Sequence, residues 1–313
     1  MSSISPMRIL IIGAGAVGGY YGARLAAAGR DVTVLVREAR AAQLRAIGLQ
    51  VISPHGDLSL TPKLLLASEI KEPFDLILLS TKAYSLDAAI KDFAPAVGPK
   101  TMILPLLNGM KHLDKLVARF GEDPVLGGST TIVADVDNEG RIHQMELLHN
   151  FNFGERDKSI TPRIQAVAAT LANAGFDDKL CPDILAVMWQ KWTMLSAMGA
   201  ITCLLRGSIG AVAAAPGGTE TALRIIAETA AIAAANGYPP PPPYLDMVNT
   251  RLTKPGSPLT ASMYRDLHKG ARVEADHILG DLLARGQAHG VVTPLLQAAC
   301  VQLSIYSSSL SAT

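Results

Sequence analysis

The stretch from Met7 to Gly22, which reads M-R-I-L-I-I-G-A-G-A-V-G-G-Y-Y-G, constrains the fold of this chain more than any other. Large apolar residues lead directly into glycines at positions 13, 15 and 18, and a helical pattern follows to Ala28. This order predicts a strand, a tight turn and a helix. The first glycine permits the turn, the second lets a pyrophosphate approach the backbone, and the third lets the helix pack close to the strand.

A second strand, Asp31 to Val36, follows at the distance that such a unit requires. We therefore expect a dinucleotide at the turn, with its phosphates at the positive end of the helix. The residues expected to hold it are Gly13, Gly15, Ala16, Val17 and Gly18. A glycine-rich turn without a ligand is the alternative.

Composition limits the class of protein. The 313 residues are 49% hydrophobic and 18% charged, which is typical of a soluble globular chain with a large core and room for two domains. Net charge is +1 and no basic block of five or more residues occurs, which argues against nucleic acid or an anionic membrane surface as partner. We expect a small-molecule ligand.

Three distant cysteines in apolar surroundings, Cys181, Cys203 and Cys300, predict buried thiols in a reducing compartment rather than disulfides. The opening residues M-S-S-I-S-P do not form an export signal, so the expected location is cytoplasmic.

Short β-rich runs alternate with helical patterns from residue 7 to about 130, which predicts a Rossmann-type, doubly wound parallel sheet in an α/β fold. The expected strands are 8–12, 31–36, 74–80, 101–105 and 125–127, with an inserted hairpin around His55 to Asp57. From 129 to 154 the pattern becomes antiparallel, with a turn at 137–140, and is expected to complete the sheet. A helix over about 160–174 would close this domain.

Only helical patterns follow Asp183, over 184–205, 218–236, 244–251, 271–289 and 293–307. We therefore predict two domains: residues 1–180 bind the cofactor, and residues 181–313 form an all-helical substrate domain. The run of five prolines from 239 to 243 is expected to be a stiff polyproline II connector. The apolar character of the second domain suggests a homodimer.

The segment Ile184 to Leu205 carries one charged side chain, Lys191, so a transmembrane helix has to be considered. Five polar residues and the lack of a second span argue against it. A helix that is apolar all round also fits the core of a helical domain.

The end of the second strand distinguishes the two nicotinamide cofactors, because an acidic residue there binds the ribose hydroxyl and an arginine accommodates a 2'-phosphate. Arg37 stands at that position, Arg40 lies nearby, and Lys82 follows the third strand as a second candidate for the phosphate. NADP(H) is therefore favoured. Glu38 would favour NAD if the register were shifted by one residue.

Reduction of a carbonyl requires a proton source beside the hydride donor. Lys191 is the lone charge of an apolar helix, where desolvation lowers the pKa of an amine and makes it a better acid near neutral pH. A lysine that extends to the surface is the alternative.

Three further side chains could position a substrate. Asn108 follows the fourth parallel strand, where ligands of such sheets bind, and its amide could orient a cofactor ribose or the substrate, although an asparagine before a glycine is also a common turn former. Glu274 lies between apolar residues and could accept a hydrogen bond from a substrate hydroxyl. Ser262 could bind a carboxylate, with helix capping as its alternative role. The histidines and carboxylates show no familiar metal-ligand spacing, so no metal site is expected.

Together these residues resemble the ketopantoate reductase (2-dehydropantoate 2-reductase) family over nearly the whole chain. The resemblance rests on G-A-G-A-V-G-G-Y-Y-G at 13–22, Arg37, T-K-A at 81–83, L-L-N-G at 106–109, W-x-K at 189–191, and S-M-Y-x-D at 262–266 followed by Glu274. It implies reduction of a 2-keto acid by NADPH, with Lys191 as general acid and Glu274 at the substrate hydroxyl. It also implies that Ser262 binds the carboxylate and that Asn108 lies between cofactor and substrate.

The chain departs from the family on the helix of Lys191. The best-known members carry asparagines four and eight residues after the lysine, where this chain has Leu195 and Gly199. Either Ser196 and Thr202 substitute for the lost amides, or the substrate is a different 2-keto acid.

Two other functions stay open at this level. A β-hydroxyacid dehydrogenase of the 6-phosphogluconate type shares the domain plan but pairs the lysine with an asparagine four residues later, which Leu195 does not provide. A non-catalytic NADP(H)-binding redox regulator would not need both Lys191 and Glu274.

Overall fold

A computed structural model describes residues 6–310 of the chain. They form two compact units: residues up to 107 together with 112–187, and residues 108–111 together with those from 188 onward. The short segment 108–111, which carries Asn108, thus belongs with the helices of the second unit.

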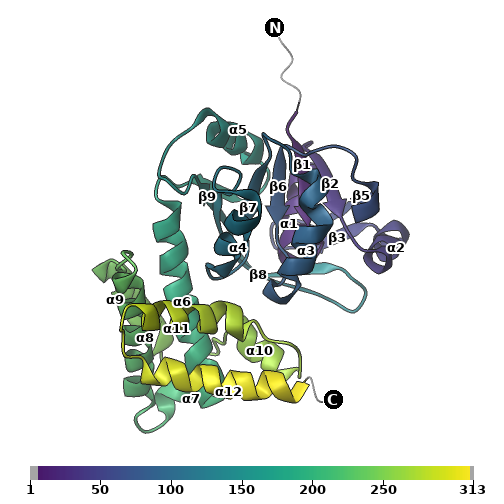
Figure 1. Ribbon diagram of the computed structural model, residues 1–313. Helices are drawn as coiled ribbons and strands as arrows, with labels where there is room; N and C mark the ends of the chain where they lie inside the picture. Colours follow the sequence, from purple (N-terminus) through teal and green to yellow (C-terminus); the bar gives the residue numbers. More distant parts are fainter. Residues whose placement is uncertain (1–5, 311–313) are drawn as a thin grey trace. The chain divides into compact units, whose positions relative to one another are not determined.

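The first unit contains a five-stranded parallel sheet in the order β5-β2-β1-β6-β7 (Figure 1). Its strands are β1 (Arg8–Ile12), β2 (Asp31–Leu35), β5 (Lys63–Leu65), β6 (Leu76–Leu79) and β7 (Met102–Pro105). Its helices are α1 (Ala16–Ala27), α2 (Glu38–Ile47), α3 (Leu86–Phe93) and α4 (Lys111–Phe120). This is the predicted Rossmann-type sheet, although β5 was not expected as one of its strands. The strand expected at 125–127 does not join it as a strand: Val125 forms only an isolated bridge to Ile103.

A second sheet was not predicted. It contains β3 (Leu49–Ile52), β4 (Leu58–Leu60), β8 (Gly127–Val136), β9 (Ile142–Gly154) and β10 (Asp177–Leu180), in the order β10-β9-β3-β4 with β8 paired to β9. The predicted hairpins around 55–57 and 137–140 both form, as antiparallel pairs. The expectation that the second hairpin completes the first sheet was wrong, because β9 pairs instead with β3 and β10.

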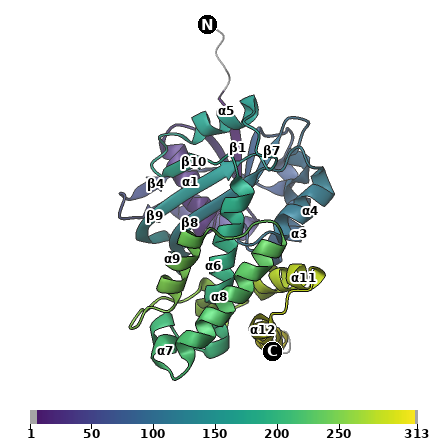
Figure 2. The same ribbon diagram turned by 90° about the vertical axis from the view of Figure 1, so that its left-hand side faces the viewer.

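Helix α1 lies between the two sheets, in contact with β1 and β2 on one side and with β3, β4, β8 and β9 on the other (Figure 2). Its aromatic residues Tyr20 and Tyr21 are fully buried for that reason. A Cβ atom at Gly19 would lie 2.3 Å from the Cδ1 of Ile142 in β9, so the second sheet can approach α1 only because this residue is glycine.

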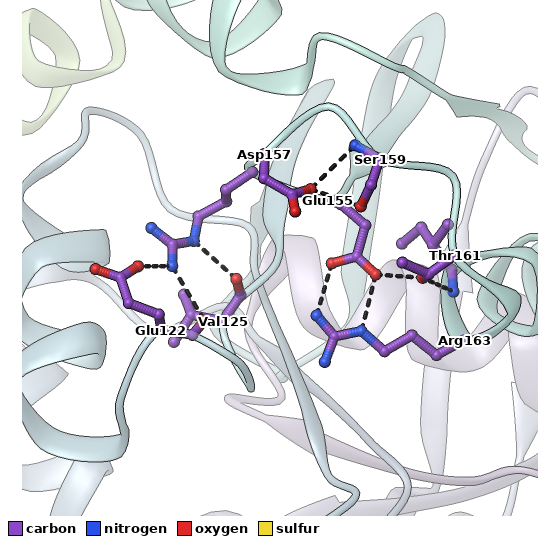
Figure 3. Close-up of polar contacts among 9 residues, drawn as sticks. Glu122, Val125, Glu155, Asp157, Ser159, Thr161 and Arg163 are labelled. Atoms are coloured by element: carbon purple, nitrogen blue, oxygen red, sulfur yellow. Dashed lines mark hydrogen bonds and ion pairs between the residues drawn. The ribbon is translucent and has the colours of Figure 1, made fainter.

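An ion pair between a buried carboxylate and a partly exposed arginine joins the end of β9 to helix α5 (Pro162–Leu171) (Figure 3). Glu155, which is 4% exposed, accepts hydrogen bonds of 2.8 and 2.7 Å from the guanidinium of Arg163 and one of 2.5 Å from the hydroxyl of Thr161. Burial raises the pKa of Glu155, but these hydrogen bonds outweigh it and hold the pKa below its usual value. The carboxylate is therefore ionised in the folded protein at neutral pH.

We expect Arg163→Ala to lower the free energy of unfolding by about 2 kcal/mol at pH 7, because it leaves a buried carboxylate without its cation. The lowered pKa of Glu155 stabilises the parent above pH 4 to 5 and is lost as pH falls. The deficit of the variant should therefore shrink in acid. Urea unfolding at pH 7 and pH 4 measures it, with Arg224→Ala, at the exposed pair with Glu220, as control. Equal losses in both variants would contradict the expectation.

Within residues 188–310, every regular element of the second unit is a helix. Its elements are α6 (Ile184–Leu205), α7 (Ile209–Ala214), α8 (Gly218–Ala235), α9 (Pro242–Leu252), α10 (Ser262–His268), a π-helix η4 (Asp276–Gly280), α11 (Asp281–Ala288) and α12 (Pro294–Leu310). Within the unit, α8 packs against α7, α9, α11 and α12.

Three details differ from the sequence analysis. Pro242 and Pro243 begin α9 rather than extending the connector, because the first turn of a helix needs no amide hydrogen from them. Helices α7 and α10 were not predicted. The helix expected from residue 271 begins only after Glu274, so that Glu274 itself precedes the helix.

Within residues 6–310 no helix is both long enough and apolar enough to cross a membrane, α6 included. The same residues contain no group of three or more histidines, cysteines or carboxylates arranged to hold a metal ion. All three cysteines are free thiols; Cys181 and Cys203 are buried as expected, and Cys300 is only half-buried.

Candidate active site

The glycine turn between β1 and α1 has the geometry that a dinucleotide phosphate requires. Gly13 adopts a φ of +98°, which side chains rarely allow, and Gly15 is the N-cap residue of α1 without a side-chain cap. A Cβ atom on Gly15 would meet no atom within 4 Å, so the backbone at this position is open. The helix amides that follow, from Ala16 and Val17 onward, are suited to bind an anion.

Thr81 provides a further polar group at this turn. Its Cγ2 and amide nitrogen both lie 3.3 Å from the Cβ position of Gly13, and its Oγ1 is buried without a hydrogen-bond partner among the described residues. A buried hydroxyl left unsatisfied costs free energy unless a ligand bonds to it. The residues present therefore fit a bound dinucleotide.

Two of the basic residues expected near the adenosine phosphate lie on the surface. Arg37 is the N-cap residue of α2 and is exposed, with Nη2 3.7 Å from a carboxylate oxygen of Asp92. Lys82 is exposed in the loop after β6, and Glu38 is exposed at the start of α2. A 3.7 Å contact between exposed side chains is weak, so Arg37 can reorient toward a phosphate.

Arg40 has a different role from the additional phosphate contact that the sequence suggested. Its Nη2 donates to the carbonyl oxygens of Ala14 and Gly140, each at 3.1 Å, and it also bonds to Gln43. The guanidinium thus connects the glycine turn to the β8–β9 turn. Burial lowers the pKa of Arg40, but an arginine remains charged at any physiological pH.

Lys191 lies in the second turn of α6 and is half-buried. Desolvation lowers the pKa of its ammonium group to about 8, in the direction that the sequence analysis predicted. The neighbouring Trp192 is buried and donates a 2.9 Å hydrogen bond from its indole nitrogen to the carbonyl oxygen of Ile278 in the π-helix. A lysine with such a pKa can both donate and accept a proton near neutral pH.

Asn108 is half-buried in the segment between β7 and α4, which packs on the same π-helix. A Cβ atom on Gly109 would lie 3.0 Å from the carbonyl oxygen of His277, and the His277 side chain is hydrogen-bonded to the backbone of Asn108. Lys111 forms a 2.6 Å ion pair with Asp276. These contacts fix the position of Asn108 relative to the π-helix.

Burial lowers the pKa of His277, although Glu274, Asp281 and the bond to Asn108 oppose this shift and Lys111 adds to it. The imidazole is therefore neutral at pH 7.

Glu274 is half-buried one residue before the helix begins, and Ser262 is exposed as the first residue of α10, where the N-cap position belongs to Ala261. Ser262 therefore does not cap the helix.

The structure thus ties two of the expected residues to one short element. The turn of α6 that contains Lys191 is bonded to the π-helix through Trp192, and the segment of Asn108 is bonded to it through His277. Glu274 is joined to the same element by the chain itself. Helices of this kind are rare and occur often at functional sites.

Sequence reasoning missed His277, Thr81 and the structural role of Arg40. His277 lies three residues after Glu274, and this spacing was the one signal in the sequence that it is near the site. Its hydrogen bond to Asn108 joins residues 169 positions apart, which no local pattern indicates. Thr81 was part of the T-K-A motif and was not singled out.

Comparisons with known proteins show the family of the chain. The family model described as "Ketopantoate reductase PanE/ApbA" matches residues 9–158, and the corresponding C-terminal model matches residues 183–306. A relative described as an uncharacterized oxidoreductase, YkpB of Bacillus subtilis, is 34% identical over 96% of this chain and 99% of its own length.

Solved structures share the fold. The crystal structure of 2-dehydropantoate 2-reductase from Geobacter metallireducens matches with a TM-score of 0.86 at 28% identity, over 96% of this chain and 99% of that one. The structure of D-mandelate dehydrogenase with NADH and anilino(oxo)acetate has the same fold, with a TM-score of 0.85 at 23% identity over 97% of this chain and 100% of that one. The two family models together span most of the sequence, and this chain therefore belongs to the ketopantoate reductase family of oxidoreductases.

Proposed function

We propose that this protein reduces the ketone of a 2-keto acid with NADPH. The observation that carries the proposal is the half-buried Lys191, whose pKa is lowered to about 8 on the helix bonded to the π-helix after Glu274. Such an ammonium group is an effective acid at neutral pH. Ketopantoate, the substrate for which the family is named, is the first to assay.

Each residue has a distinct role in this proposal. The bound cofactor supplies the hydride, and Lys191 donates a proton to the oxygen of the carbonyl as negative charge develops there. Glu274 accepts a hydrogen bond from the hydroxyl that forms. Asn108 orients the bound molecules, and Ser262 donates a hydrogen bond to the substrate carboxylate.

The adenosine phosphate is assigned to Arg37 and Lys82, two exposed cations near the expected ribose position. Because an arginine follows β2 where NAD-binding proteins have an acidic residue, NADPH is favoured. The D-mandelate dehydrogenase of the same fold binds NADH, so both cofactors have to be assayed.

The pH profile tests the proposed acid. Burial lowers the pKa of Lys191 to about 8, and reduction needs its protonated form. We therefore expect kcat/KM for the keto acid to be constant below about pH 7 and to fall tenfold per unit above about pH 8. Oxidation of the hydroxy acid needs the neutral amine and should rise with the same midpoint. A reduction rate that stays level to pH 10 would contradict the role of Lys191.

Arg37→Ala tests the cofactor assignment. The variant should raise KM for NADPH by about 10- to 100-fold and leave KM for NADH within twofold, because only NADPH carries the 2'-phosphate. Arg45→Ala, on the exposed part of the same helix, is the matched control. An equal loss with both cofactors would mean that Arg37 supports the fold rather than the phosphate.

A further inference from the structure

The face of α6 beside Lys191 is a hydrocarbon surface. Residues three, four and seven positions after a helical residue lie on its face, and here these are Met194, Leu195 and Met198, all half-buried. Helical side chains also lean toward the N-terminus, so Leu195 leans over the turn that carries Lys191. Any group bound beside the ammonium on this face meets apolar atoms.

The hydroxyl groups of α6 do not make this apolar face polar. Thr193, Ser196 and Thr202 are buried, and each donates to a backbone carbonyl oxygen: that of Trp189 at 2.9 Å, Ile278 at 3.4 Å and Met198 at 2.8 Å, respectively. Ser196 and Thr202 therefore do not replace the two amides absent from positions 195 and 199. Their hydroxyls are committed to the protein itself.

The space beside Gly199 is also apolar. A Cβ atom built at this position would lie 2.8 Å from the terminal methyl group of Met263 and 3.9 Å from a methyl group of Leu279. Met263 is buried and directly follows Ser262. A polar side chain could not enter position 199 unless Met263 moved.

From these contacts we infer that the substrate is a 2-keto acid whose side chain is a hydrocarbon next to the carbonyl, rather than one that carries a hydroxyl there. The inference rests on the proposed function, because it assumes that the substrate binds beside Lys191. A hydroxyl placed against Met194, Leu195 and Met198 loses its hydrogen bonds to water and gains none from these side chains. Apolar pockets discriminate against such a hydroxyl by roughly 10- to 100-fold.

Two substrates isolate that hydroxyl. Ketopantoate and 3,3-dimethyl-2-oxobutanoate differ only in the hydroxyl group, so their ratio of kcat/KM with the unmodified protein measures its effect. We expect the dimethyl acid to be preferred about tenfold or more. A preference for ketopantoate overturns the inference but leaves the proposed function intact. Failure to reduce any 2-keto acid with NADPH or NADH, in a panel that includes pyruvate, overturns both.

A variant of Leu195 tests whether the apolar face of α6 causes the preference between these two substrates. Leu195→Asn supplies an amide that can bond to the extra hydroxyl, and should shift the ratio toward ketopantoate by about three- to tenfold. Leu195→Met, which retains an apolar side chain of similar volume, and Leu223→Asn, on α8 and 39% exposed, should leave the ratio within twofold. An unchanged ratio in a folded Leu195→Asn protein overturns the assignment. The measurement on the unmodified protein decides the inference even if that variant does not fold.

Discussion

Lys191→Ala is expected to lower kcat for 2-keto acid reduction by about 10²- to 10⁴-fold, the range that a positioned general acid contributes. The affinity for NADPH should change little, because the residues assigned to its phosphates, in the glycine turn and at Arg37 and Lys82, are in the other unit of the chain. Single-turnover reduction measured by NADPH absorbance, with cofactor binding titrated separately, gives both quantities.

The stability of the same variant separates chemistry from folding. Removing an ammonium group that pays a desolvation penalty should leave the free energy of unfolding unchanged or raise it. Lys254→Ala, at an exposed lysine, is the matched control and should retain full activity. A Lys191→Ala protein that is folded and within twofold of the parent rate would remove Lys191 from the mechanism.

The elements that the sequence predicted well are those whose signals are local. The bounds of α6 were predicted correctly because one long apolar run lies between Asp183 and Arg206. The parallel strands β1, β2, β6 and β7 were found because each is a short run of mostly buried apolar residues. The lowered pKa of Lys191 followed from the absence of other charges on its helix.

What the sequence did not reveal depends on distant partners. The strand β10 reads D-D-K-L and has no apolar alternation, so only its pairing with β9 makes it a strand. The second sheet arises because β3 and β9 meet across about 90 residues, which no local pattern encodes. The π-helix after Glu274 likewise depends on packing, since its residues would also suit an α-helix.

Charge alone was a poor guide to the role of Arg40. A basic residue near a phosphate site is expected to bind phosphate, yet this guanidinium bonds to backbone carbonyl oxygens on two turns. A buried carbonyl oxygen needs a hydrogen-bond donor, just as a bound phosphate does.

The homodimer, the cytoplasmic location and the individual site residues stay predictions.

The three glycines of the first turn are expected to respond differently to alanine, which separates ligand binding from packing. A Cβ atom at Gly18 would lie 2.0 Å from the hydroxyl oxygen of Ser80 and 2.3 Å from the carbonyl oxygen of Gly13. Gly18→Ala should therefore lower the free energy of unfolding by about 1 to 3 kcal/mol. Adding Ser80→Ala should restore only part of this, because the carbonyl of Gly13 stays in place.

Gly15→Ala, by contrast, should leave stability nearly unchanged and weaken NADPH binding. Its backbone, at φ −89° and ψ −164°, suits any residue, and a Cβ atom there has nothing within 4 Å, so stability should stay within about 0.5 kcal/mol of the parent. If a pyrophosphate approaches this backbone, the added methyl group excludes it, and NADPH affinity should fall at least about tenfold, or 1.4 kcal/mol. Thermal unfolding with and without NADPH measures both effects. Unchanged affinity in Gly15→Ala would mean that the cofactor does not contact this turn, which would then serve packing alone.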